Sequence, residues 1–167
     1  MKKLSVLFAA VMMLVSFGFA NAQKVATADV TAILNMMPEK IKAEDQLKAF
    51  SAAKQAEIEK LATAFSAEVE KYQKVDGPKM TQPQREAKEA ELQKTQQQLQ
   101  AMSQQAQKDM AEKSEAAYGP IEKRLNDAIT RAAKANGYDF IFDSATQGLI
   151  YKAGPDATAA IKKELGL

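Results

Sequence analysis

The feature that most constrains the fold is a tight reversal at Val75–Pro78 (VDGP), set inside a long helical stretch. Asp, Gly and Pro together are a strong signal for a turn. The segments on either side, Pro38–Val75 and Gln82–Tyr118, are nearly equal in length, and at about 1.5 Å per residue each would span roughly 55 Å as a helix. A second interruption, Gly119-Pro120, closes the base. The sequence therefore predicts an antiparallel helical hairpin over residues 38–119, with its tip near residues 75–81.

A stripe of apolar residues follows one face of the first arm. Ile58, Leu61, Phe65, Val69 and Tyr72 recur at steps of three, four, four and three, the spacing of a helical face. Such a stripe is most often the seam of a coiled coil. The alternative is that some members face a cavity and contact a bound polypeptide. The candidates for that contact, over both arms, are Phe50, Leu61, Phe65, Tyr72, Leu92, Leu99, Met102 and Met110.

The second arm begins with a capping pattern and continues with few apolar residues. Thr81 is a candidate N-cap, and Gln84 stands three residues later, as in a capping box. Glutamine dominates the stretch between Gln93 and Gln107. Because glutamine forms helices but buries little surface, we expect this part of the hairpin to be solvated, weakly packed and mobile.

Short elements flank the hairpin. Residues 24–29 have extended character, and Asp29 or Thr31 is placed to cap a brief helix before Pro38. The second arm continues as a firmly buried helix and ends at Asn136-Gly137. Residues 138–143 and 149–151 then read as strands, and Asp156 is a candidate cap for a last helix. The predicted fold is mainly α, with a small β body formed by residues 23–37 and 120–167.

This body contains only about sixty residues, too few to bury much apolar surface. Its short strands would also leave exposed edges that can pair with another chain. Both arguments predict an oligomer assembled through the body. The candidate contact residues are Val25, Ile33, Phe140, Ile141, Phe142, Leu149 and Ile150.

The composition argues against catalysis and against nucleic-acid binding. The chain has no Cys and no His, so the usual thiol nucleophile, imidazole base and zinc site are missing. No Gly-rich phosphate loop occurs, and the acidic residues of the helices alternate with lysines. We therefore expect no enzyme, no metal and no cofactor. Removing Lys2 and Lys3 from the 23 basic residues leaves 21 against 21 acidic ones, and a neutral chain gives little reason to bind nucleic acid.

Residues 1–22 resemble a secretory signal peptide. Lys2 and Lys3 precede an apolar run from Leu4 to Phe19, and Ala20-Asn21-Ala22 is a small-x-small cleavage pattern. We expect cleavage after Ala22 and a mature protein outside the cytoplasm.

The hairpin tip carries a modest excess of basic residues. Two acidic residues, Asp76 and Glu86, lie in the same stretch. This patch is either a solvated turn or a weak contact for an anionic membrane surface or an acidic polypeptide. Its basic residues are Lys71, Lys74, Lys79, Arg85 and Lys88.

The order of these elements resembles the Skp/OmpH family of periplasmic chaperones. Four segments carry the resemblance, which covers essentially the whole mature chain. They are Val25–Met37 (VATADVTAILNMM), Ala132–Asp143 (AAKANGYDFIFD), Leu149–Lys152 (LIYK) and Asp156–Leu165 (DATAAIKKEL). The hairpin is similar to the family in length and composition only.

The resemblance implies a homotrimer in which strands of three subunits form a small body and three hairpins surround a cavity. It implies an ATP-independent holdase that keeps unfolded outer-membrane β-barrel proteins, its clients, from aggregating in the periplasm. The alternative is a structural coiled-coil spacer, or an envelope assembly factor with one folded partner. An irregular, Leu-poor seam favours the holdase, because a rigid spacer would need sustained heptads.

Overall fold

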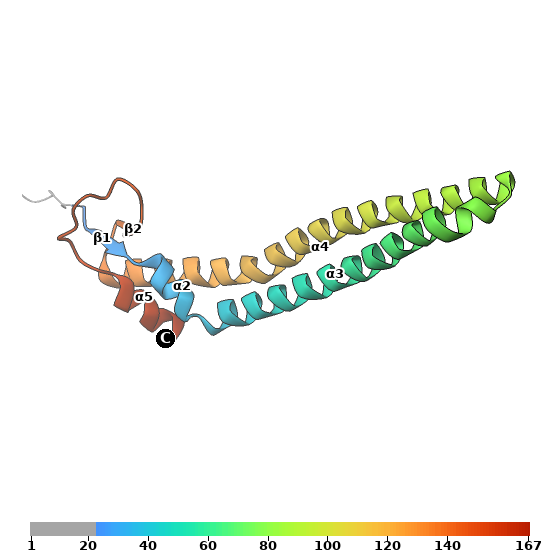
Figure 1. The fold of residues 1–167 in the computed structure, drawn as a ribbon. Coiled ribbons are helices and arrows are strands. Elements are labelled where there is room, and N and C mark those ends of the chain that lie inside the picture. The colour runs from blue at the N-terminus through green and yellow to red at the C-terminus, as the bar shows by residue number, and fades with distance from the viewer. Residues whose placement is uncertain (1–22) are drawn as a thin grey trace, which may run out of the picture. The chain divides into compact units, whose positions relative to one another are not determined.

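A computed structural model describes residues 23–167 of the chain (Figure 1). The expected signal peptide and its cleavage site after Ala22 lie outside the described residues. The predicted fold class is confirmed: long helices dominate, and the only sheet among residues 23–167 has two strands. The elements in chain order are β1 (Val25–Ala28), α2 (Val30–Met36), α3 (Pro38–Lys71), η1 (Tyr72–Asp76), η2 (Gly77–Lys79), α4 (Gln82–Asn136), β2 (Phe140–Asp143) and α5 (Thr158–Leu165).

The described residues fall into two compact units. One contains residues 23–33 together with Asp127–Leu167, and the other is Leu34–Asn126. We call them the body unit and the hairpin unit. The division predicted from the sequence, at residues 37 and 120, remains a prediction.

The hairpin unit contains two antiparallel helices that lie side by side (Figure 1). Pro38 begins α3 at its first position, where its missing N–H has no helical partner to lose. Glu39 follows in the first turn, where the helix dipole favours an acid. One of the two hydrogen bonds of the capping box predicted at the start of α4 is present, since Gln84 Oε1 accepts the N–H of Thr81 at 2.9 Å.

At the reversal the helical backbone first widens into a π turn and then tightens into a 3₁₀ turn. A single π-helical turn, η1, follows α3 and leads into the 3₁₀ turn η2. The N–H of Gly77 donates to the carbonyl of Tyr72, and a Cβ at Gly77 would lie only 2.7 Å from that oxygen. Glycine is therefore required here for close approach, and its φ of −57° is an ordinary helical value.

The predicted break at Gly119-Pro120 is wrong, because α4 continues through Pro120 to Asn136. Proline removes one helical hydrogen bond and crowds the preceding turn. It also crowds the Cβ of the residue before it. That residue is Gly119, which has no Cβ, and this reduces the steric cost of keeping the helix. The predicted stop at Asn136-Gly137 is confirmed, with Gly137 at φ +67°.

The body unit is built on a parallel pair of strands. β1 and β2 pair from Val25↔Phe140 to Ala28↔Asp143. The segment before α5 lines the other side of β1, where Thr27 donates to Pro155 at 2.9 Å and accepts from Ala157 at 2.7 Å. Residues far apart in the chain thus share one small layer.

Two aspartates accept backbone N–H groups at the starts of α2 and α5. Asp29 caps α2 by accepting the N–H of Ala32 at 2.8 Å, as one of the two predicted caps. Asp156 accepts the N–H of Thr158 at 2.8 Å at the start of α5. The Thr158 hydroxyl oxygen also accepts the N–H of Asp29, so the two helix starts are tied together.

The predicted strand at Leu149–Tyr151 is wrong, because these residues have no regular secondary structure. Its branched and aromatic composition suits a strand, but no segment of the described chain pairs with it. Ile150 and Tyr151 are 97% and 82% exposed. Strand propensity reflects packing against neighbours, and these residues have no such neighbours within the described chain.

Small residues and a few aliphatic side chains form the buried core. Ile33 and Ile161 are fully buried in the body unit, and Met37 is buried in the hairpin unit. The predicted buried portion of α4 is confirmed at Ile121, Leu125 and Ala132, whereas Ile129 is half-buried. The remaining buried apolar residues are Ala26, Ala28, Ala43, Ala128, Ala157 and Leu165.

Candidate functional site

The two arms pack without a buried core over most of their length. Within residues 44–120 no residue is buried, although both helices are well formed. The eight predicted contact residues are half-buried: Phe50, Leu61, Phe65, Tyr72, Leu92, Leu99, Met102 and Met110. They form a thin apolar seam along the two arms, and each side chain remains partly exposed to solvent. Whether they contact a client remains a prediction.

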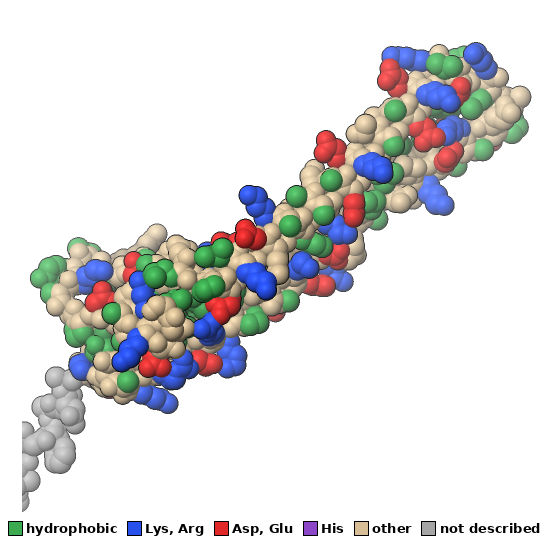
Figure 2. All heavy atoms as spheres, turned by 90° about the horizontal axis from the view of Figure 1, so that it is seen from below, with side chains coloured by type: hydrophobic (Ala, Val, Ile, Leu, Met, Phe, Trp, Pro, Cys, Tyr) green, Lys and Arg blue, Asp and Glu red, His purple; other side chains and the backbone are tan. Residues whose placement is uncertain are grey.

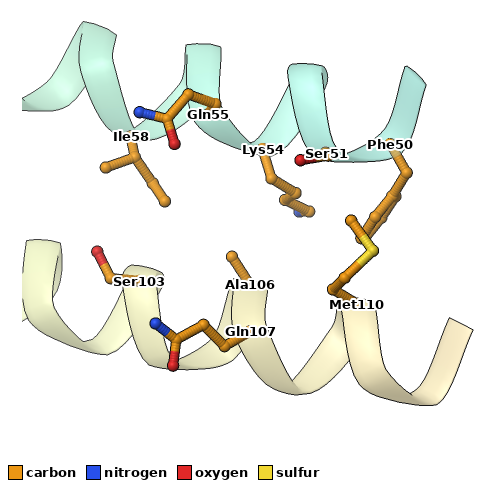
Figure 3. Close-up of a pocket in the computed structure, with 9 residues that line it drawn as sticks. All are labelled: Phe50, Ser51, Lys54, Gln55, Ile58, Ser103, Ala106, Gln107 and Met110. Atoms are coloured by element: carbon orange, nitrogen blue, oxygen red, sulfur yellow. The ribbon is translucent and has the colours of Figure 1, made fainter. Parts of the chain in front are cut away.

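A gap opens in this seam near the middle of the hairpin (Figure 3). It has a volume of about 500 Å³. Ile58 points from α3 toward α4, and Ala106 of α4 faces it with only a methyl group. The other lining residues are Phe50, Ser51, Lys54, Gln55, Ser103, Gln107 and Met110.

One end of the gap is aromatic and cationic. The Met110 side chain reaches from α4 to Phe50 on α3 (Figure 3). The Lys54 ammonium lies 5.7 Å from the Phe50 ring centroid, and that of Lys113 lies 4.9 Å from it. Both distances are within the range in which an aromatic ring attracts a cation. Lys54 is further paired with Glu57 at 3.3 Å.

A second, smaller gap of about 270 Å³ lies between the arms near Pro120. Ala43 and Ala117 line it together with Ile121, so most of its wall is apolar. An ion pair between Arg124 and Glu39 joins the two arms beside it. This polar link holds the arms together where small side chains leave space.

The surface of the arms is polar and of mixed charge. Figure 2 shows acidic and basic side chains interspersed along one face, with hydrophobic side chains scattered between them. The Gln residues between Gln93 and Gln107 are all exposed, as expected for a solvated helix face. Such a surface offers many weak contacts and no single strong one.

Polar contacts across the arms concentrate near the tip. The Tyr72 hydroxyl donates to Glu89 at 2.8 Å, and this hydrogen bond raises the pKa of Tyr72 above its ordinary value. Lys88 bridges Glu68 on α3 and Glu91 on α4, and its hydrogen bond to Glu68 raises the pKa of Lys88. These links connect Glu68 of α3 and Tyr72 of η1 with α4, next to the reversal.

Ion pairs near the tip reduce the positive charge of the predicted basic patch. Lys71 pairs with Asp76 at 3.4 Å and Lys74 with Glu70 at 2.7 Å. Lys88 is held between two carboxylates. Arg85 donates to the uncharged side chain of Gln82 at 3.3 Å, which does not neutralise it. The charge count over residues 71–88 included Asp76 but missed Glu68, Glu70 and Glu91, because these partners precede or follow that stretch. The patch remains a prediction.

The predicted oligomer-contact residues are exposed with two exceptions. Ile33 is fully buried in its own body unit, where it serves as a core residue, and Ile141 is half-buried. Phe140 and Phe142 stack with ring centroids 6.4 Å apart on the exposed side of β2. The exposed members of the set are Val25, Phe140, Phe142, Leu149 and Ile150.

Sequence reasoning missed the gap itself. Ile58 was recognised as a member of the apolar stripe of the first arm, yet a stripe does not reveal which residues of the two arms face each other. The available signal was the pair of small residues Ser103 and Ala106, three positions apart on the second arm.

Among residues 23–167 no group of Asp and Glu is arranged to hold a metal ion. No helix in this part of the chain is long and apolar enough to cross a membrane.

Comparisons of sequence and of structure show which known proteins this chain is similar to. The model of the family described as "Outer membrane protein (OmpH-like)" matches residues 24–165. The chain is similar to proteins named Chaperone protein Skp from Pectobacterium atrosepticum, 23% identical over 144 residues and 86% of each chain. It is also similar to that of Photorhabdus luminescens, 26% identical over 151 residues and 90% of each chain.

A solved structure shares the fold. It is a crystal structure from Caulobacter crescentus described as an outer membrane chaperone, OmpH-like. The superposition has a TM-score of 0.72, covers 88% of this chain and 86% of the other, and pairs residues with 19% identity. The helical hairpin and small sheet are thus an arrangement that an experimental structure also adopts.

Proposed function

This chain belongs to the OmpH-like outer membrane protein family, and from that membership we propose that it is an ATP-independent holdase chaperone. Its clients are unfolded outer-membrane β-barrel proteins, which it keeps from aggregating in the periplasm. The names of its relatives, Chaperone protein Skp, support this function. No step of this function requires a catalytic residue, a cofactor or nucleic acid.

One observation carries the proposal: the seam of the hairpin is apolar but not buried. Half-buried side chains such as Leu61, Phe65 and Leu99 offer a client many small apolar contacts without exposing a large contiguous apolar patch. Each contact is weak, so an unfolded chain can be held by many of them together and still be released. A rigid spacer would instead bury its seam, as sustained heptads do.

The assembly we propose is a homotrimer. Phe140, Phe142 and Ile150 expose apolar surface on a body unit that has few large buried side chains of its own. Association through these residues and through the open edge of β2 would bury that surface. The arms of three copies would then enclose a client-binding cavity. Export to the periplasm, with cleavage after Ala22, completes this proposal.

Weak contact with an anionic membrane surface is a further part of the proposal. It would involve the tip residues Lys71, Lys74, Lys79, Arg85 and Lys88. The ion pairs at Lys71, Lys74 and Lys88 limit its strength. Sedimentation with anionic vesicles should therefore show weak binding that added salt removes. Equal binding to neutral vesicles would contradict an electrostatic contact.

The experiment that tests the holdase function is a measurement of client range. Several unrelated urea-unfolded proteins, including an outer-membrane β-barrel protein, are diluted into the purified protein, and aggregation is followed by light scattering. A holdase suppresses aggregation of the unfolded chains and ignores the same proteins once folded. Binding to one folded partner, with no effect on unfolded chains, would support the structural role instead.

A further inference from the structure

The gap in the middle of the seam has the dimensions of a binding site. Its volume of about 500 Å³ lies within the usual range for small-molecule sites. Both walls belong to the hairpin unit, so the gap is present in a single copy of the chain. Ser103 turns its hydroxyl back to the carbonyl of Leu99 at 3.0 Å, and Ala106 presents only a methyl group. The space therefore exists because α4 carries small side chains opposite Ile58.

The lining of the gap suits one kind of group. Phe50, Ile58 and Met110 supply an apolar surface, and methionine adapts its shape and makes favourable contacts with ring edges. The Lys54 ammonium lies at the gap, 5.7 Å from the Phe50 centroid. An ammonium at an apolar wall attracts the negative face of an aromatic ring and gives no such attraction to an aliphatic side chain.

We propose that this gap is a socket for one aromatic side chain of a bound client. The inference rests on the holdase function proposed above. β-Barrel membrane proteins carry girdles of aromatic residues, so an unfolded client presents such side chains repeatedly along its length. Each hairpin then holds a client at an aromatic residue, between Phe50 and Met110 and beside Lys54, in addition to the weaker contacts along the seam.

The absence of tryptophan from this chain provides a direct assay. A short, soluble, unstructured peptide with a single Trp is titrated with the purified protein, and all Trp fluorescence then comes from the peptide. We expect a saturable blue shift. Peptides with Tyr, Phe or Leu in place of Trp should compete in that order, with the Leu peptide about two- to fivefold weaker than the aromatic ones.

Two variants in which an alanine of α4 is replaced by phenylalanine locate the site. Ala106→Phe fills the gap, whereas the matched control Ala101→Phe adds the same ring to an exposed position of the same helix. We expect at least a tenfold loss of Trp-peptide binding for Ala106→Phe and none for the control. Circular dichroism checks that both variants keep the helical content of the parent. In addition, Lys54→Gln should reduce the preference for Trp over Leu.

Methyl NMR identifies the contact atom by atom. The Trp ring should shift the Met110 methyl resonance upfield through its ring current and leave that of Met80, at the tip, unchanged. Equal peptide binding by Ala106→Phe and Ala101→Phe, or a larger shift at Met80, would overturn the socket.

A parallel aggregation assay separates this inference from the function on which it rests. If the parent protein suppresses aggregation of an unfolded barrel protein but Ala106→Phe binds the peptide normally, the socket fails and the holdase function stands. If the parent does not suppress aggregation, the holdase function fails. Selective loss of peptide binding in Ala106→Phe would even then assign the gap as an aromatic site.

Discussion

Gly77 is where a single side chain atom would disturb the reversal of the hairpin. Its backbone passes so close to the Tyr72 carbonyl that an added Cβ would lie 2.7 Å away. We predict that Gly77→Ala lowers the free energy of unfolding by about 1–2 kcal/mol, since the backbone of the tip must shift. Urea unfolding measures the loss, and hydrogen exchange should be faster at residues 72–81.

The matched control is Gly154→Ala. A Cβ at Gly154 would meet only the Val25 carbonyl, at an ordinary contact distance of 3.6 Å. We expect this variant to be unchanged or slightly more stable, because alanine reduces the freedom of the unfolded chain. Equal destabilisation by both variants would show that the close approach at Gly77 is not the cause.

Asp156 makes the stability of the body unit depend on pH. Its hydrogen bonds from the hydroxyl and the N–H of Thr158 hold the pKa of this carboxyl below its ordinary value. The ionised form is therefore stabilised in the folded state. Its contribution is complete at pH values above the ordinary Asp pKa and is lost as the pH falls through the lower value of the folded state.

We predict that Asp156→Asn makes unfolding less sensitive to acid. The amide oxygen can still cap α5, but the side chain cannot be protonated in this range. Urea midpoints measured from neutral pH to below about pH 3.9 should fall less in the variant than in the parent. Asp45→Asn, on the exposed surface of α3, controls for the loss of one charge. An unchanged acid response in Asp156→Asn would contradict the role assigned to this carboxylate.

At the scale of elements, α4 contains two prolines in different positions. Pro120 is inside the helix, where it removes a hydrogen bond, and Pro83 lies in the first turn, where it removes none. We predict that Pro120→Ala raises the free energy of unfolding by about 1–3 kcal/mol, while Pro83→Ala changes it little. Urea unfolding and slower hydrogen exchange around residue 120 would show the difference. Equal effects of the two substitutions would mean that Pro120 is not strained.

The sequence predicts turns and helix ends well where a single residue determines the local backbone conformation. The turn at Gly77, the cap at Asp29, the Gln84 hydrogen bond to Thr81 and the stop at Gly137 all follow from single residues. The strand expected at Leu149–Tyr151 failed because pairing depends on a partner that the described chain does not provide. The break expected at Gly119-Pro120 failed because glycine relieves the crowding that proline causes.

The candidate site was only partly predictable for a related reason. Spacing along one helix identified the half-buried residues, including Phe50 and Met110. The gap depends on which residues of α3 and α4 face each other, and that register is a property of the pair of helices. Likewise, Glu68 became evident as an acidic partner of Lys88 only once the arms lay side by side.

At the scale of the whole molecule, the two units differ in how they are packed. Ile33 and Ile161 are fully buried in the body unit, whereas no residue is buried between residues 44 and 120 of the hairpin. Few buried contacts allow local opening. We predict that amides of residues 44–116 exchange with solvent much faster than those of β1 and α5, as measured by hydrogen–deuterium exchange. Uniform protection over both units would contradict a soft, adaptable hairpin.

Native mass spectrometry tests the central claim most directly. The protein is measured alone and after a urea-unfolded outer-membrane β-barrel protein has been diluted into it. We predict a trimer alone and a trimer carrying one client chain in the mixture. A trimer that leaves the client to aggregate would contradict the chaperone function, and a monomer would contradict the association of the body units.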